Sequence, residues 1–211
     1  MDLRRRAVLE LAVLAVAVPL FLVVIPARPV LIDLGLAALG LAFIALGRRE
    51  TRRTVWCDTP PASASRRADR VLAAATLAVV LVMAAARFFL GRDTDAMFAA
   101  AFLGTVALFA PWAWLQQALF QFYLLGRLRL LLGHVGDVAI AGVNGALFAA
   151  VHAPQWDVVI ATGPAGWLWS YYYLRARRLL PLALSHAALG TAYFYALRGE
   201  DLLGRWLAFL W

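Results

Sequence analysis

Long apolar runs alternate with short arginine-bearing segments along this chain. Each run is near the ~20 residues that an α-helix needs to cross the hydrocarbon core of a membrane. The pattern therefore predicts an all-α fold, a polytopic membrane helical bundle with about seven transmembrane helices. The expected spans are 7–25, 30–47, 71–90, 96–126, 138–153, 158–174 and 179–197. Pro111 lies inside the fourth span and is expected to kink it.

Composition agrees with a membrane protein and excludes several other classes. Hydrophobic residues make up 64% of the 211 residues, against about 45–50% in a soluble globular domain. The net charge is +8, but the basic residues, all arginine, lie in short runs between apolar spans. That distribution indicates membrane topology and excludes nucleic acid as a partner. Cys57 is the only cysteine, so an intramolecular disulfide and a cysteine metal cluster are excluded.

The distribution of arginine also predicts the orientation. If the N-terminus is cytoplasmic, 15 of the 20 arginines lie on the cytoplasmic side, which favours N-terminus in and C-terminus out. The polar, basic segment 48–70 is then expected to be a cytoplasmic loop that fixes topology and can meet anionic lipid. The tail 198–211 is too short to cross and is expected to lie in the membrane interface. The composition, rich in Ala, Leu and Val, favours a multi-pass protein of the bacterial inner (cytoplasmic) membrane.

Three glutamines stand out within the fourth apolar span: Gln116, Gln117 and Gln121. Burying an amide in hydrocarbon is costly unless it finds a hydrogen-bond partner, so these side chains are expected to face protein and not lipid. Gln117 and Gln121 are four residues apart and share one helix face. One interpretation is interhelical hydrogen bonding alone. The other is that the amides line a functional cavity.

Two histidines lie within the later spans. His152 follows Asn144 and Phe148 at intervals of four, and His186 has Gly190 four residues after it. Taken singly, each histidine is more typical of a structural residue, and Asn144 of helix packing. Histidine inside a membrane is expensive, however, and it can exchange protons near neutral pH. If the helices bundle around a shared polar cavity, the histidines and the glutamines form a candidate site there.

At this point the pattern resembles the CPBP family of CAAX prenyl proteases and bacteriocin-processing membrane proteins, described as glutamic-type intramembrane proteases. That family carries Glu-Glu-x-x-x-Arg on one helix, Phe-x-x-x-His on a second and His-x-x-x-Asn/Asp on a third. Here the first motif aligns with QQALFQF at 116–122, and the second is Phe148-Ala-Ala-Val-His152. The third is half matched by His186-Ala-Ala-Leu-Gly190. The resemblance covers residues 100–195.

The resemblance implies catalytic roles that this sequence only partly supports. In the family, the first glutamate activates water, and the histidines position it and stabilise the oxyanion. An amide cannot take a proton from water as a carboxylate can. No metal and no cofactor are expected, because two histidines and amides fall short of a catalytic zinc site. The residues carried over as the catalytic site are Gln116, Gln117, Gln121, His152, His186 and Gly190.

Three functions remain open from the sequence. The first is an active or altered intramembrane endopeptidase, a peptide hydrolase that cleaves an anchored substrate. The second is an inactive pseudoprotease that binds a membrane-anchored or lipidated protein segment within the lipid bilayer. The third is an unrelated small transporter or assembly factor. The expected domains are an N-terminal three-span region at 1–95, a CPBP-like four-helix core at 96–197 and an interfacial tail at 198–211.

Overall fold

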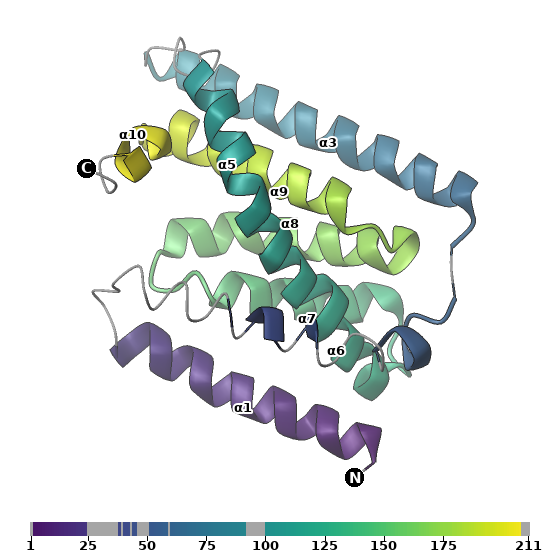
Figure 1. Cartoon of the computed structure of the whole chain (residues 1–211). Helices are drawn as coiled ribbons and strands as arrows, with labels where there is room; N and C mark the ends of the chain where they lie inside the picture. The colour runs from purple at the N-terminus through teal and green to yellow at the C-terminus, as the bar shows by residue number, and fades with distance from the viewer. Residues whose placement is uncertain are drawn as a thin grey trace. The chain divides into compact units, whose positions relative to one another are not determined.

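The structure, a computed structural model, describes residues 2–24, 38, 40–42, 44–45, 51–58, 60–91 and 100–207. In this part of the chain the regular structure is entirely helical, which confirms the all-α class (Figure 1). The α-helices are α1 (Leu3–Val24), α3 (Ala62–Phe89), α5 (Ala100–Gln117), α6 (Leu125–Leu132), α7 (Asp137–Ala150), α8 (Trp156–Ala176), α9 (Leu179–Ala192) and α10 (Leu202–Leu207). The π-helices η1 (Ala118–Leu124) and η2 (Tyr193–Arg198) continue α5 and α9.

The chain forms two compact units that interleave along the sequence. Unit one contains Met1–Pro61 and Gln117–Arg177, and unit two contains Ala62–Gln116 and Arg178–Trp211. The boundaries predicted from the sequence, after residues 95 and 197, instead follow chain order and stay a prediction.

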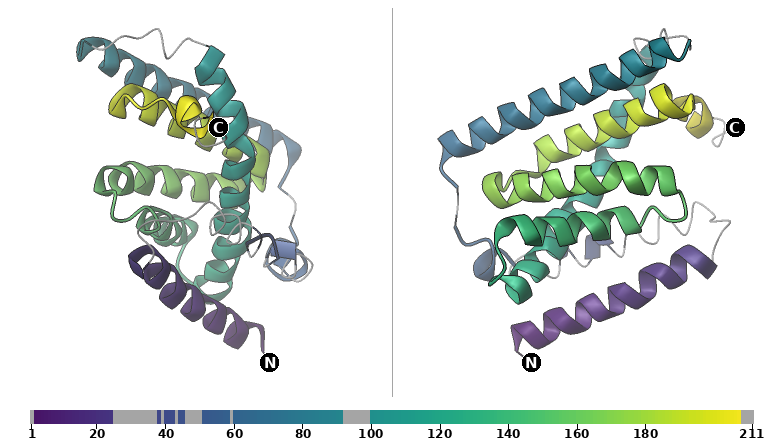
Figure 2. Two further views of the ribbon diagram at one scale, coloured as in Figure 1. Left: turned by 60° about the vertical axis from the view of Figure 1, so that its left-hand side comes forward. Right: turned by 180° about the vertical axis from the view of Figure 1, so that it is seen from behind.

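In unit one, α7 and α8 lie side by side along most of their length (Figure 2). Glycines permit this close approach. A Cβ atom on Gly145 would lie 2.5 Å from the backbone nitrogen of Trp167, and one on Gly166 would lie 3.1 Å from the Phe148 side chain. Small residues at a helix–helix contact are the usual means of bringing backbones together in membrane proteins. The pair therefore forms a tightly packed support for the polar side chains of α7.

In unit two, α3 packs against α9 and η2. Polar contacts join these elements as well as apolar ones. The Thr76 and Ser185 hydroxyls are 2.7 Å apart, and the buried Arg87 donates to the backbone carbonyl of Tyr195. The Tyr195 hydroxyl also lies 3.0 Å from the Thr105 hydroxyl on α5. Tyr195 belongs to an apolar cluster with Ala192, Ala196 and Leu202, against which Val80 and Met83 of α3 pack.

The observed helices bear on the predicted spans only in part. The last three predicted spans correspond in position to α7, α8 and α9 with η2. Among the described residues, α3 is the one helix long and apolar enough to cross a membrane by length and composition. The predicted span 30–47 lies mostly outside the described residues. The seven spans and their orientation stay a prediction.

The predicted loop 48–70 is wrong in its second part, and residues 51–54 form a short helical turn. Helix α3 begins at Ala62, so residues 62–70 are helical. The pair Pro60-Pro61 ends the preceding irregular segment, and the alanines and arginines that follow have high helix propensity. Polar composition therefore did not distinguish the loop from the basic first turns of α3. Pro111 lies inside α5 and does not end it.

Candidate functional site

The six residues that the sequence nominates are divided between the two units. Unit one carries Gln117, Gln121 and His152, and unit two carries Gln116, His186 and Gly190. Their convergence on one cavity stays a prediction, and each set has its own geometry.

The glutamines of unit one are fully buried. Gln117 ends α5 and Gln121 lies in η1, and both side chains are 0% exposed. A π-helical turn inside a longer helix often marks a functional site. Asn144 of α7 donates from Nδ2 to Oε1 of Gln121 at 3.1 Å and to Oγ of Ser170 at 2.8 Å. We call Gln121, Asn144 and Ser170 the amide network; it joins η1, α7 and α8.

The amide network has unused hydrogen-bonding capacity. Nε2 of Gln121 and Oδ1 of Asn144 are buried, and neither has a hydrogen-bond partner among the described residues. The nitrogen and oxygen of an amide side chain can be assigned either way round. If they are exchanged in Gln121 alone or in Asn144 alone, the two side chains face each other with two donors or with two acceptors. If they are exchanged in both residues, one amide nitrogen and one amide oxygen are again left without a partner. The network therefore keeps one buried donor and one buried acceptor without a partner among the described residues.

His152 lies in the turn just after α7 and is half-buried. Its Nδ1 is 2.8 Å from the backbone oxygen of Phe148. A carbonyl oxygen only accepts, so Nδ1 carries the proton and Nε2 of the neutral ring is the proton-accepting nitrogen. The Phe148 ring also contacts the imidazole, with the two ring centres 5.1 Å apart. Phe148 and His152, the two fixed residues of the Phe-x-x-x-His motif, are thus in contact, and the imidazole has a defined tautomer.

In unit two, an aromatic ring fills the space beside Gly190. His186 is buried and packs at an edge-to-face angle on Phe109 of α5, with ring centres 5.5 Å apart. A Cβ atom on Gly190 would lie 2.9 Å from Cε1 of the same phenylalanine. Phe109 therefore occupies the place in which an Asn or Asp side chain at 190 would begin. Gln116 is half-buried, and its Oε1 has no hydrogen-bond partner among the described residues.

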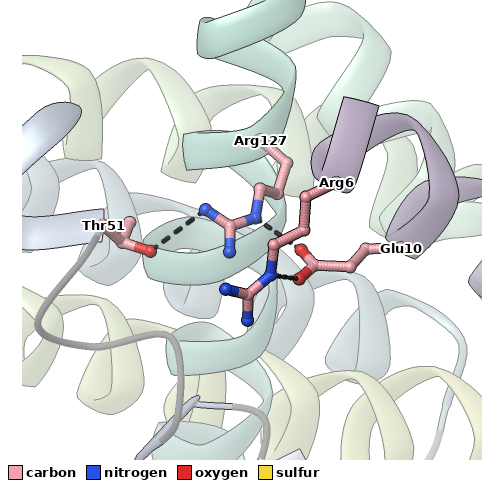
Figure 3. Close-up of polar contacts among 4 residues, drawn as sticks. All are labelled: Arg6, Glu10, Thr51 and Arg127. Carbon is pink, nitrogen blue, oxygen red and sulfur yellow. Dashed lines mark hydrogen bonds and ion pairs between the residues drawn. The ribbon is translucent and has the colours of Figure 1, made fainter. Parts of the chain in front are cut away.

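A buried ion pair in unit one was not predicted from the sequence. Arg127 of α6 is 1% exposed, and its Nε donates to Oε2 of Glu10 on α1 at 2.7 Å (Figure 3). Arg6 donates to the other carboxylate oxygen of Glu10 at 2.9 Å, and Arg127 Nη1 lies 3.4 Å from the Thr51 hydroxyl. Arg127 lies within α6, which continues to Leu132. The missed signal is Glu10, an ionisable residue in an apolar span that requires a partner.

Comparison with known proteins supplies the family. Residues 96–192 match the family model described as "Type II CAAX prenyl endopeptidase Rce1-like". This match places residues 96–192 in the CPBP family. No curated protein and no solved structure matches the chain. The matched segment of this CPBP-family protein contains all six candidate residues.

Family membership makes this chain an integral membrane protein that is related to intramembrane proteases. The residues at the site do not resemble a metal centre. Among the described residues, no group of three His, Cys, Asp or Glu side chains is placed to hold a metal ion. The chemistry of the CPBP-family site therefore has to be argued from amides and imidazoles.

Proposed function

We propose that this CPBP-family protein binds a membrane-anchored protein segment and does not hydrolyse it at the rate of a peptidase. The observation that carries the proposal is the fully buried, neutral amide network in the segment that matches the family. At the aligned positions the family pattern has ionised groups. Here the aligned positions carry uncharged amides, and Gln121 hydrogen-bonds as one.

The chemical argument rests on the general base. Peptide hydrolysis requires a group that removes a proton from water, and removing such a group commonly costs about 10²–10⁴-fold in rate. Gln116, at the position of the activating glutamate, has no basic atom near neutral pH. Gln116, which is half-buried and whose Oε1 has no hydrogen-bond partner among the described residues, can still accept a hydrogen bond from a bound segment. Loss of catalysis with retention of binding follows from the same substitutions.

A second function, weak hydrolysis with histidine as the base, is favoured by one observation. Nδ1 of His152 is held by the Phe148 carbonyl, which orients the ring and leaves Nε2 as the proton acceptor. This arrangement fixes a tautomer as a carboxylate would in a catalytic dyad. In that case the protein cleaves its anchored partner slowly.

The first experiment separates binding from cleavage. The purified full-length protein, in detergent, carries a photo-crosslinking amino acid in place of Gln116, or in place of the exposed Arg66 as a control. It is incubated with a peptide that is prenylated on its C-terminal cysteine and with the same peptide lacking the prenyl group. We expect the prenylated peptide to crosslink at 116 and not at 66, and to remain intact. Intact peptide without any crosslink at 116 would contradict the proposal.

The second experiment restores the family pattern. Gln116→Glu, Gln117→Glu and Gln121→Arg are combined with Gly190→Asn, and Phe109→Ala is added because the ring would collide with the new side chain. We expect this variant to cleave the peptide and the same variant with His152→Ala not to do so. If the unmodified protein cleaves, and both His152→Ala and His186→Ala abolish cleavage, the hydrolytic function replaces the binding function.

A further inference from the structure

An indole ring in unit one is held in place by groups from two other parts of the chain. Trp56 follows the short helical turn at 51–54, and its Nε1 donates to the backbone carbonyl of Phe122 at 2.9 Å. The edge of Tyr173 packs against the indole, with ring centres 5.5 Å apart and an interplanar angle of 85°. The indole is therefore fixed on one side by α8 and on another by η1.

Two arginines gather on this indole. The guanidinium carbon of Arg177 lies 3.9 Å from the ring centre of Trp56, and that of Arg129 lies 5.6 Å from it. Both distances are within the range of a cation–π contact. Arg177 caps α8 with φ 56°, a left-handed conformation that usually selects glycine. We call Trp56, Arg129, Tyr173 and Arg177 the arginine–tryptophan cluster.

The positive charge of this cluster is poorly balanced. Among the described residues, no ion pair joins Arg129 or Arg177 to a carboxylate, and the buried Nε of Arg177 has no hydrogen-bond partner. Asp137 and Asp58 favour the charged form of Arg177 only weakly, and the Asp137 carboxylate lies 3.9 Å from Arg175. Burial, followed by the repulsion of Arg129, lowers the pKa of Arg177 to about 10. An anion at this place would relieve the repulsion between the two arginines.

We propose that the arginine–tryptophan cluster binds a phosphate group, and that the headgroup of an anionic phospholipid supplies it. Guanidinium groups match phosphate oxygens with paired hydrogen bonds, and the aromatic ring holds the guanidinium planes in position. Tryptophan is typical of the headgroup level of a membrane. The cluster shares no residue with the proposed peptide site, so this inference is independent of it.

The test measures lipid retention by native mass spectrometry. The full-length protein in detergent is titrated with phosphatidylglycerol and, separately, with phosphatidylcholine. We expect the unmodified protein to retain phosphatidylglycerol preferentially. We expect Arg129→Gln combined with Arg177→Gln to lose about fivefold in affinity for each arginine removed. The matched control, Arg66→Gln with Arg67→Gln, removes the same charge from exposed positions at the start of α3 and should retain the lipid.

Further arms identify the source of the phosphate and guard against misfolding. Displacement of phosphatidylglycerol by millimolar inorganic phosphate would uphold the phosphate site and assign it to the free anion. Arg177→Lys keeps the charge and loses the planar stacking, and it should retain less lipid than the unmodified protein. Equal retention of the two lipids by the unmodified protein would overturn the proposal whether or not any variant folds. Equal losses in the double variant and its control would also overturn it.

Discussion

Two buried polar clusters lie close together in the sequence of unit one, and they differ in charge. Gln121 of η1 belongs to a neutral amide network, whereas Arg127 of α6 is paired with the carboxylate of Glu10. Gln121 is 0% exposed and Arg127 is 1% exposed. Desolvation is therefore nearly complete at both places, and charge is the property that distinguishes them.

The difference shows that this protein is able to bury a charge where a partner is provided. Arg127 is enclosed because Glu10 and the Thr51 hydroxyl contact its guanidinium. The amides at Gln117 and Gln121 thus do not reflect an inability of unit one to hold an ionised group. A buried ion pair can be replaced as a unit by neutral residues with little loss of stability. The neutral network is what such a joint replacement produces, and this supports a site that has kept its packing and lost its base.

The largest expected effect comes from breaking the ion pair. Arg127→Met removes the guanidinium and leaves the Glu10 carboxylate with Arg6 alone. Removing one partner of a buried pair typically destabilises by about 3–5 kcal/mol, because the other charge stays buried. Arg6, which is itself partly exposed, should hold the loss near the lower end. Thermal unfolding of the detergent-purified protein measures the effect.

The control for that prediction removes both charges together. Arg127→Met combined with Glu10→Gln should recover most of the lost stability, since the one ion that then lacks its partner, Arg6, is partly exposed to water. If the double variant is as unstable as Arg127→Met alone, packing and not charge is the contribution of Arg127. The two buried clusters would then differ less than their charges suggest.

A smaller effect is expected in the amide network. Asn144→Leu has a similar volume and removes the donor that serves both Gln121 and Ser170. Leaving buried polar groups unpaired costs about 1–3 kcal/mol, less than an unpaired charge. Val143→Leu, at an exposed position on the same helix, is the matched control and should be nearly neutral. A loss of stability for Asn144→Leu as large as that for Arg127→Met would show that leaving a neutral group unpaired costs as much here as leaving a charge unpaired.

The sequence was informative where a pattern repeats along one helix. The span expected at 158–174 lies within α8, and the one expected at 179–197 corresponds to α9 with η2. Asn144 and Phe148, expected on one stripe of α7, are both fully buried. His152, expected on the same stripe, lies in the turn just after α7, and its ring contacts that of Phe148. Local periodicity and short-range spacing were sufficient for these features.

Contacts between distant segments were not predictable in the same way. Glu10 and Arg127 are 117 positions apart, and nothing in either apolar stretch specifies the other as its partner. The filling of the space beside Gly190 by Phe109 depends on how α5 packs on α9. Ser170 was not singled out, although a hydroxyl on an apolar span is a signal for a buried hydrogen bond. Tertiary packing, which a single sequence does not state, decides each of these.

An exposed polar contact in unit two should contribute least to stability among the polar contacts compared here. The exposed Asp201 accepts from the Tyr195 hydroxyl at 2.6 Å and from the backbone N–H of Gly204 at 3.0 Å. The Tyr195 hydrogen bond and then the Gly204 N–H hold the pKa of Asp201 below its ordinary value. A lowered pKa contributes stability that is fully present above the unfolded-state value, about 3.9, and is lost as the pH falls through the folded-state value.

Asp201→Asn should therefore lower the melting temperature at pH 7, by the equivalent of less than about 1 kcal/mol because water screens the group. Melting curves at pH 7, 5 and 3 should show the difference from the unmodified protein shrinking toward pH 3, and a difference that grows with acidity would contradict this assignment.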